Sequence, residues 1–123
     1  MNTFFMTAGI TTFVICGIHC WFGGRHIAAP LLKARDIHQV PKFTNYYCWH
    51  LVTLALIAMA SAFVWAAISP EAIELAVFSA ALSVSFCLWN LALIIWKKQS
   101  FRELPQWSLF LVSSLIGCLG FAA

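Results

Sequence analysis

Four long apolar runs, separated by short polar segments, organise this chain. They cover about residues 3–23, 46–68, 71–96 and 105–122. Each is close to the roughly 20 residues that a helix needs to cross a bilayer. The connections between the later runs are short, so neighbouring helices must run antiparallel. The pattern predicts an all-α fold: a four-helix antiparallel transmembrane bundle that forms a single domain over residues 1–123.

Composition supports a membrane location. Hydrophobic residues make up 63% of the chain and charged residues only 9%, against about 45–50% and about 25% in soluble domains. We therefore expect the bilayer to be the principal partner. No stretch combines clustered basic residues with exposed aromatics, so we predict no nucleic-acid binding. The five cysteines are an odd number and lie mostly within apolar runs, where a free thiol behaves as a small hydrophobe.

The first two of the three connections differ in character. Residues 25–42 are polar and contain Pro30 and Pro41, which predicts a loop at the membrane surface with a short amphipathic piece over residues 31–40. Between the second and third runs, Ser69 is suited to a helix N-cap and Pro70 to the first helical position. This second connection is expected to be a tight turn.

Sidedness follows from the basic residues, because Lys and Arg concentrate in short cytoplasmic loops. All of them lie in the first and third connections: Arg25, Lys33, Arg35, Lys42, Lys97, Lys98 and Arg102. We expect a bacterial inner-membrane protein with both termini in the periplasm. Segments 25–42 and 97–103 would then be cytoplasmic.

Residues 16–50 hold most of the unusual chemistry, including all four histidines and three of the five cysteines. Helical spacing places five of these residues on one face of the first helix, within an arc of about 120°: Cys16, His19, Cys20, Gly23 and His26.

Depth in the bilayer selects one pair of histidines. His19 lies six residues before Arg25, and His50 eight residues after Lys42. At 1.5 Å per residue, each lies roughly 9–12 Å inside the cytoplasmic boundary. Asn90, seven residues before Lys97, has a similar depth. Ionisable groups so placed usually face the bundle interior and indicate function.

Two histidines at one level on antiparallel helices predict b-type haem with His19 and His50 as axial ligands. Arg25 and Lys42 would pair with the propionates, and Asn90 would donate a hydrogen bond beside the ligands. The predicted role is electron transfer, haem sensing or haem handling. No acid, base or nucleophile with a recognisable context appears, so we assign no catalytic residue.

Three alternatives stay open. The first is a copper or zinc site that draws on His19 and His50 with His26, Cys16 and Cys20 as alternates, although no known metal-binding signature is present. The second is that His19 and His50 only pack between helices. The small and hydroxyl-bearing residues of the third run are likewise expected to form helix contacts. The third is a non-catalytic accessory or scaffold subunit, either a homo-oligomer or part of a larger complex, with Gly117 and Gly120 at the interface.

The orientation predicts the outcome of reporter fusions. An alkaline phosphatase fused at the C-terminus should be active, because this reporter folds only outside the cytoplasm. The same reporter inserted in residues 97–102 should be inactive. Phosphatase activity from that insertion would contradict the orientation.

Overall fold

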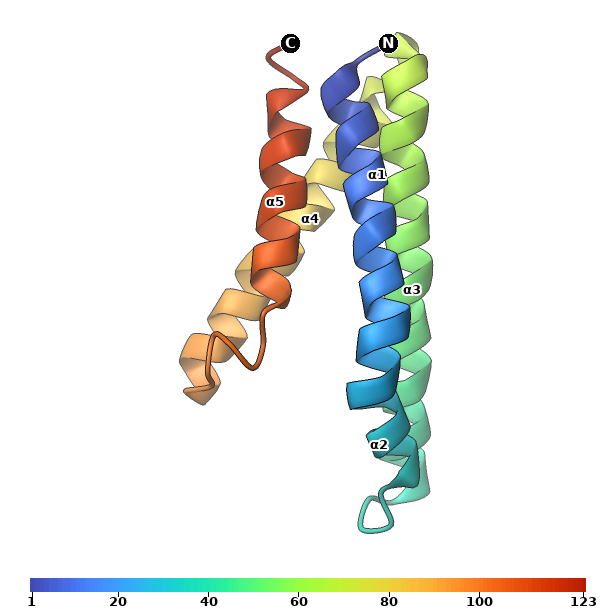
Figure 1. Ribbon diagram of the computed structural model, residues 1–123, viewed down its shortest axis with the longest axis vertical. Coiled ribbons are helices and arrows are strands. Elements are labelled where there is room, and N and C mark those ends of the chain that lie inside the picture. The colour runs from blue at the N-terminus through green and yellow to red at the C-terminus, as the bar shows by residue number, and fades with distance from the viewer.

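The computed structural model describes all 123 residues and consists of helices without strands (Figure 1). Helix α1 (Thr3–Ile18) continues into a π-helix, η1 (His19–Ala28), and a short α2 (Ala29–Lys33). The other elements are α3 (Gln39–Ile68), a 3-10 turn η2 (Pro70–Ala72), α4 (Ile73–Lys97) and α5 (Gln106–Leu119). The prediction of an all-α fold is confirmed.

Three continuous helical stretches are long and apolar enough to cross a membrane, by length and composition: Thr3–Lys33, Gln39–Ile68 and Pro70–Lys97. Helix α5 is also apolar but has only 14 residues. The four apolar helices predicted from the sequence are therefore present, and the fourth is shorter than expected.

The helices are arranged as two pairs (Figure 1). Helix α1 packs mainly on α3, and α4 packs mainly on α5. Both chain ends lie at one end of the molecule, which we call the termini end. The two pairs separate toward the opposite end, called the hairpin end, where residues 34–38 connect α2 to α3.

The predicted loop over residues 25–42 is wrong in extent. Only residues 34–38 lie outside the helices, so the first and second helices form a long hairpin. Pro41 stands in the first turn of α3, where proline is tolerated. Pro30 lies within the continuous helical stretch Thr3–Lys33, where η1 gives way to α2. The His38 side chain accepts a hydrogen bond from the Val40 N–H, and Lys42 Nζ donates to the Ala34 carbonyl. These bonds start α3 at Gln39 instead of residue 46.

The remaining helix ends differ less from the prediction. Ser69 occupies the predicted cap position, but its side chain makes no capping bond, and Pro70 opens a 3-10 turn before α4 begins at Ile73. Helix α4 ends where Lys98 adopts a left-handed backbone (φ 51°) and its N–H bonds to the carbonyls of the last turn.

Small side chains dominate the packing near the termini end. The largest buried cluster combines two phenylalanines with five alanines: Phe5, Ala8, Phe63, Ala66, Ala67, Ala76 and Ala80. Ser79 and Ser83 of α4 are also fully buried. The packing role predicted for the small residues of the third helix is confirmed by this burial. Ser83 Oγ donates to the Phe110 carbonyl of α5 (3.2 Å), whereas Ser79 Oγ has no hydrogen-bond partner.

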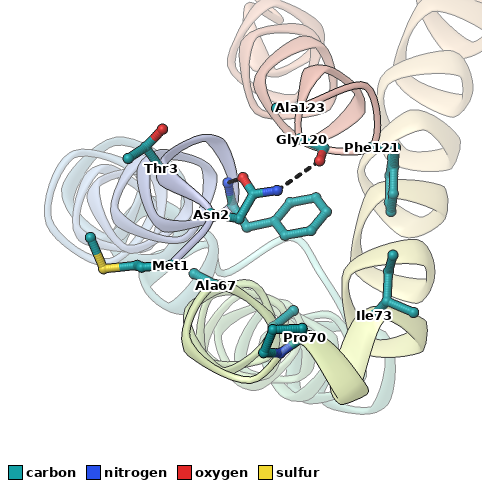
Figure 2. Close-up of a pocket in the computed structure, with 11 residues that line it drawn as sticks. Met1, Asn2, Thr3, Ala67, Pro70, Ile73, Gly120, Phe121 and Ala123 are labelled. Atoms are coloured by element: carbon teal, nitrogen blue, oxygen red, sulfur yellow. Dashed lines mark hydrogen bonds between the residues drawn. The ribbon is translucent and has the colours of Figure 1, made fainter.

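Asn2 ties three helix ends together. Its Oδ1 accepts from the N–H groups of Phe4 and Phe5 and so caps α1, at 3.0 and 3.1 Å. Its backbone N–H donates to the Ala67 carbonyl at the end of α3 (2.8 Å). Its side-chain amide donates to the Gly120 carbonyl after α5 (2.7 Å), the bond drawn in Figure 2. The termini end is therefore closed by hydrogen bonds as well as by packing.

Gly9 allows α1 to approach α3 closely. A Cβ at this position would lie 2.6 Å from Val64 Cγ2 and 3.0 Å from the Ala60 carbonyl oxygen. Gly17 lies on the same helix, and a Cβ there would meet no atom within 4 Å. The two glycines thus form a matched pair for measuring this contact.

We expect Gly9→Ala to lower the free energy of unfolding by about 1–3 kcal/mol, because the added methyl group overpacks the contact between α1 and α3. Gly17→Ala should leave stability unchanged or slightly higher, since alanine favours the helix. Unfolding in detergent can be followed by thiol-reactive dye labelling of the buried Cys16 and Cys87. Equal unfolding temperatures for the two variants would contradict the importance of this contact.

Candidate functional site

A cleft of about 470 Å³ lies at the hairpin end, where the two helix pairs separate. The first helix lines it with Ile15, Ile18, His19, Phe22, Gly23, His26 and Ile27. Helix α3 contributes Trp49, Val52 and Leu56. The link after α4 and the start of α5 contribute Glu103, Pro105, Gln106, Leu109 and Phe110.

A second cavity, about 430 Å³, lies at the termini end against Asn2 and Gly120 (Figure 2). No His, Cys, Asp or Glu lines it. The cleft at the hairpin end is therefore the candidate site, because it combines an apolar lining with titratable groups.

His19 is held against α3. Its ring stacks on Trp49 with the centroids 3.9 Å apart and an interplanar angle of 18°. Its Nε2 lies 3.2 Å from the Trp49 carbonyl oxygen. Because a carbonyl only accepts, Nε2 carries the proton and Nδ1 is the acceptor nitrogen of the neutral ring. The indole fits here since residue 23 is glycine: a Cβ there would lie 2.5 Å from Trp49 Cη2.

His26 has the opposite tautomer. Its Nδ1 lies 2.9 Å from the Phe22 carbonyl oxygen, and its ring stacks on that of Phe22 at 4.2 Å between centroids. Nδ1 is therefore the donor, which leaves Nε2 with a free lone pair. A backbone bond to one ring nitrogen that orients the other is also how proteins hold a ligating histidine.

The facing side of the cleft comes from the link after α4 and the first turns of α5. Gln106 Oε1 is buried and has no hydrogen-bond partner. Asn90 of α4 positions this side, because its Oδ1 accepts from the Trp107 N–H at the start of α5 (3.0 Å). Cys87 Sγ lies 3.3 Å from the Trp107 carbonyl oxygen as a second tie. An unpaired buried acceptor is costly, and the protein itself covers this oxygen, so it is not open to a molecule in the cleft in this structure.

The histidines of the first helix lie in the π-helix. Such helices are rare, usually a single turn long, and frequent at functional sites, whereas η1 has 10 residues. Gly23 and Gly24 are weak α-helix formers and lie in its middle. His19, Phe22, Gly23 and His26 of this segment all line the same cleft.

Of the two predicted haem ligands, only His19 lines the cleft. His50 is exposed, and its ring packs edge-on against Tyr46 of the same helix at 4.7 Å between centroids. The residue that joins His19 at the cleft is His26, one of the alternate ligands.

The other predicted site residues lie outside the cleft. Arg25 is exposed, and Lys42 donates to the Ala34 carbonyl. Asn90 holds the start of α5 and does not line the cleft. Cys16 and Cys20 face Thr53 of α3, with each Sγ 4.0 Å from a Thr53 oxygen.

No three His, Cys, Asp or Glu side chains gather as a group that would hold a metal ion. All five cysteines are free thiols. The copper or zinc alternative therefore gains no support from the arrangement of the side chains.

Gly117 and Gly120 were expected at an interface with another chain, and this placement is wrong. Both are buried within the molecule. A Cβ on Gly117 would lie 3.0 Å from Phe63 Cζ, and Gly120 packs against the Phe5 ring. They allow α5 to approach α3 and α1.

Glu103 and Gln106 were not recognised from the sequence. Glu103 is the only acidic residue in the link after α4, which is a weak signal by itself. Gln106 had no signal, because the close approach of this link to the first helix depends on the angle between the two helix pairs.

No protein-family model matches this chain, and no curated protein or solved structure shows significant similarity to it.

Proposed function

We propose that this is an integral membrane protein that binds a membrane-soluble amphipathic ligand in the cleft at the hairpin end. The observation that carries the proposal is the cleft itself, which has apolar sides and a small set of polar groups with free hydrogen-bonding capacity. Pre-formed pockets of this kind, between helices of a bundle, are the usual sites of small-molecule binding.

The exposed surface supports insertion in a bilayer. Large apolar side chains lie on the outside of every helix, among them Trp21 (73% exposed), Phe78 (62%) and Ile95 (69%). A surface this apolar is stable in lipid and would aggregate in water. All seven basic residues lie in the hairpin of the first two helices, at the end of α4 or in the link after it, so in the proposed orientation the hairpin end is cytoplasmic.

Polarity changes along the cleft. His26 and Glu103 are adjacent in sequence to Arg25 and Arg102, near the proposed cytoplasmic boundary. Ile15 and Leu56 lie further along their helices toward the centre of the bundle and are buried and apolar. A ligand that matches this order has a polar head at the boundary and an apolar body in the hydrocarbon region.

Haem is the second candidate, favoured by the free Nε2 of His26. Ligation by His19 and His50 from opposite faces does not fit this packing, because Trp49 fills the space beside Gly23 between the two helices. Ligation by His26 alone fits better, since its Nδ1 is already fixed by the Phe22 carbonyl. Haem bound there would supply one-electron transfer or a sensing function.

The proposed function predicts that filling the cleft expels a co-purified ligand. Val52 lines the cleft, whereas Leu54 of the same helix is exposed elsewhere. Val52→Trp should remove an amphipathic small molecule that native mass spectrometry detects on the purified protein, and Leu54→Trp should leave it bound. If the purified wild-type protein carries no ligand, or carries one that Val52→Trp does not expel, the proposal is contradicted and the accessory-subunit role is favoured.

The haem candidate predicts a Soret band for protein purified in mild detergent. His26→Ala should abolish or shift the band, because it removes the free imidazole nitrogen of the cleft. His38→Ala, in the hairpin turn, is the matched control and should not change the spectrum. A band lost with His50→Ala and kept with His26→Ala would restore the ligand pair predicted from the sequence, and a colourless protein would exclude haem.

A further inference from the structure

We infer that the tip of the helical hairpin, residues 25–47, binds the headgroups of anionic phospholipids. The inference rests on the membrane location in the proposed function, but it does not depend on the cleft. Three properties of the tip carry it: its length beyond the hydrocarbon layer, its excess of basic side chains and an exposed apolar face that continues into the apolar part of α3.

The hairpin is longer than a bilayer requires. Its two helical stretches, Thr3–Lys33 and Gln39–Ile68, contain 31 and 30 residues, which is about 45 Å of helix at 1.5 Å per residue. The hydrocarbon layer is only about 30 Å thick. No charged residue precedes Arg25 or lies between Lys42 and Ile68. The excess length therefore lies at the hairpin end, which extends beyond the end of α4 (Figure 1).

This excess length matches the headgroup layer. Counted back from Ile68, about 20 residues of α3 cross the hydrocarbon layer, which then ends near residue 48. Tyr47 and Phe43 follow within about 8 Å of helix, and the headgroup layer is about 5–8 Å thick on each side. Lys42 lies at the outer edge of that layer. Long basic side chains at this level can reach back to the lipid phosphates.

Basic residues outnumber acidic ones at the tip. Residues 25–42 contain four Lys or Arg residues and a single acidic residue, Asp36. Arg25, Lys33 and Arg35 are exposed. The termini end has no Lys or Arg. Because an anionic membrane surface attracts each Lys or Arg close to it, the charge of the tip is complementary to acidic headgroups.

The turn of the hairpin is ordered by its own hydrogen bonds. The Val40 N–H donates to His38 Nδ1 at 3.3 Å, and Lys42 Nζ donates to the Ala34 carbonyl. These two bonds close the turn around Arg35, whose side chain is exposed. A pre-ordered turn loses less conformational entropy on binding than a flexible loop would.

An exposed apolar face accompanies the basic residues. Five apolar side chains of α3, each at least 43% exposed, lie within an arc of about 80°: Val40, Phe43, Tyr47, Leu51 and Leu54. The face thus runs from the tip into the part of α3 that faces hydrocarbon in the proposed orientation. Aromatic residues at its outer end suit the headgroup level. This continuity favours a lipid over an acidic soluble protein as the occupant.

The test measures the lipid selectivity of the full-length protein in phosphatidylcholine nanodiscs that contain a trace of spin-labelled lipid. Electron paramagnetic resonance gives the ratio of spin-labelled phosphatidylglycerol to spin-labelled phosphatidylcholine immobilised on the protein. The wild type should prefer phosphatidylglycerol about fivefold, the effect of one basic side chain near each bound headgroup. The preference should fall toward one at about 1 M salt, which screens charges beyond about 3 Å.

Two triple variants remove equal charge at two places. The first changes exposed basic residues of the tip: Arg25→Gln, Lys33→Gln and Arg35→Gln. The second, the matched control, changes those at the end of α4 and in the link: Lys97→Gln, Lys98→Gln and Arg102→Gln. The first should bring the ratio close to one. The second should keep most of the preference, because Lys97 already lies over the Trp96 ring at 4.0 Å.

A third variant should raise the preference. Asp36→Asn removes the only acidic residue of the tip, and misfolding would not produce such a gain. Labelling of the buried Cys16 and Cys87 shows whether each variant is folded. Equal ratios for the two triple variants, or no gain with Asp36→Asn, would overturn the assignment to the tip. A wild-type ratio near one would also overturn it and leave an acidic protein as the partner.

The outcome separates this inference from the proposed function. Val52→Trp fills the cleft and should leave the lipid ratio unchanged, whatever it does to a ligand in the cleft. A preference lost with Val52→Trp would place the bound headgroup in the cleft and overturn the assignment to the tip. A wild-type protein that does not enter nanodiscs would overturn both the inference and the proposed function.

Discussion

The close packing of α1 against α3 is the constraint on which the rest of the structure depends. Gly9 allows the two backbones to approach at Val64, and Gly23 makes room for the Trp49 ring further along. Apolar helices in lipid gain little from the hydrophobic effect, so short contacts and interhelical hydrogen bonds must hold them together. The first helix and α3 therefore pack along much of their length, and α4 with α5 packs against this pair.

The second pair is fixed strongly at only one end. Near the termini, Asn2 bonds to the ends of α3 and α5, and Gly120 packs on Phe5. The buried hydroxyl groups of Thr12 and Ser113 also lie within hydrogen-bond distance, 3.0 Å apart. At the hairpin end, where the pairs separate, comparable ties are made only within each pair, such as Asn90 with Trp107. The cleft is thus a consequence of where small residues and hydrogen bonds are distributed along the helices.

The same distribution explains the chemistry of the cleft. Backbone carbonyls within the first helix and α3 set the tautomers of His26 and His19, so each ring keeps one acceptor nitrogen. Gln106 of the other pair also lines the cleft, but its Oε1 is an unpaired acceptor that the protein itself covers. The proposed amphipathic ligand would place its polar head near His26 and Glu103 and its apolar body beside Ile15 and Leu56.

The sequence by itself determined the helical class, the four apolar runs and the grouping of basic residues. These features depend on local composition and on the spacing of hydrophobic residues along the chain. It also identified His19, with His26 as an alternate. Only the tertiary structure decided that His50 is off the cleft and that Gln106 and Glu103 are on it. Spacing along one helix predicts which residues share a face, but not which neighbour that face meets. That choice depends on glycine contacts such as Gly9 with Val64 and on the angle between the helix pairs, and neither is encoded in any single segment.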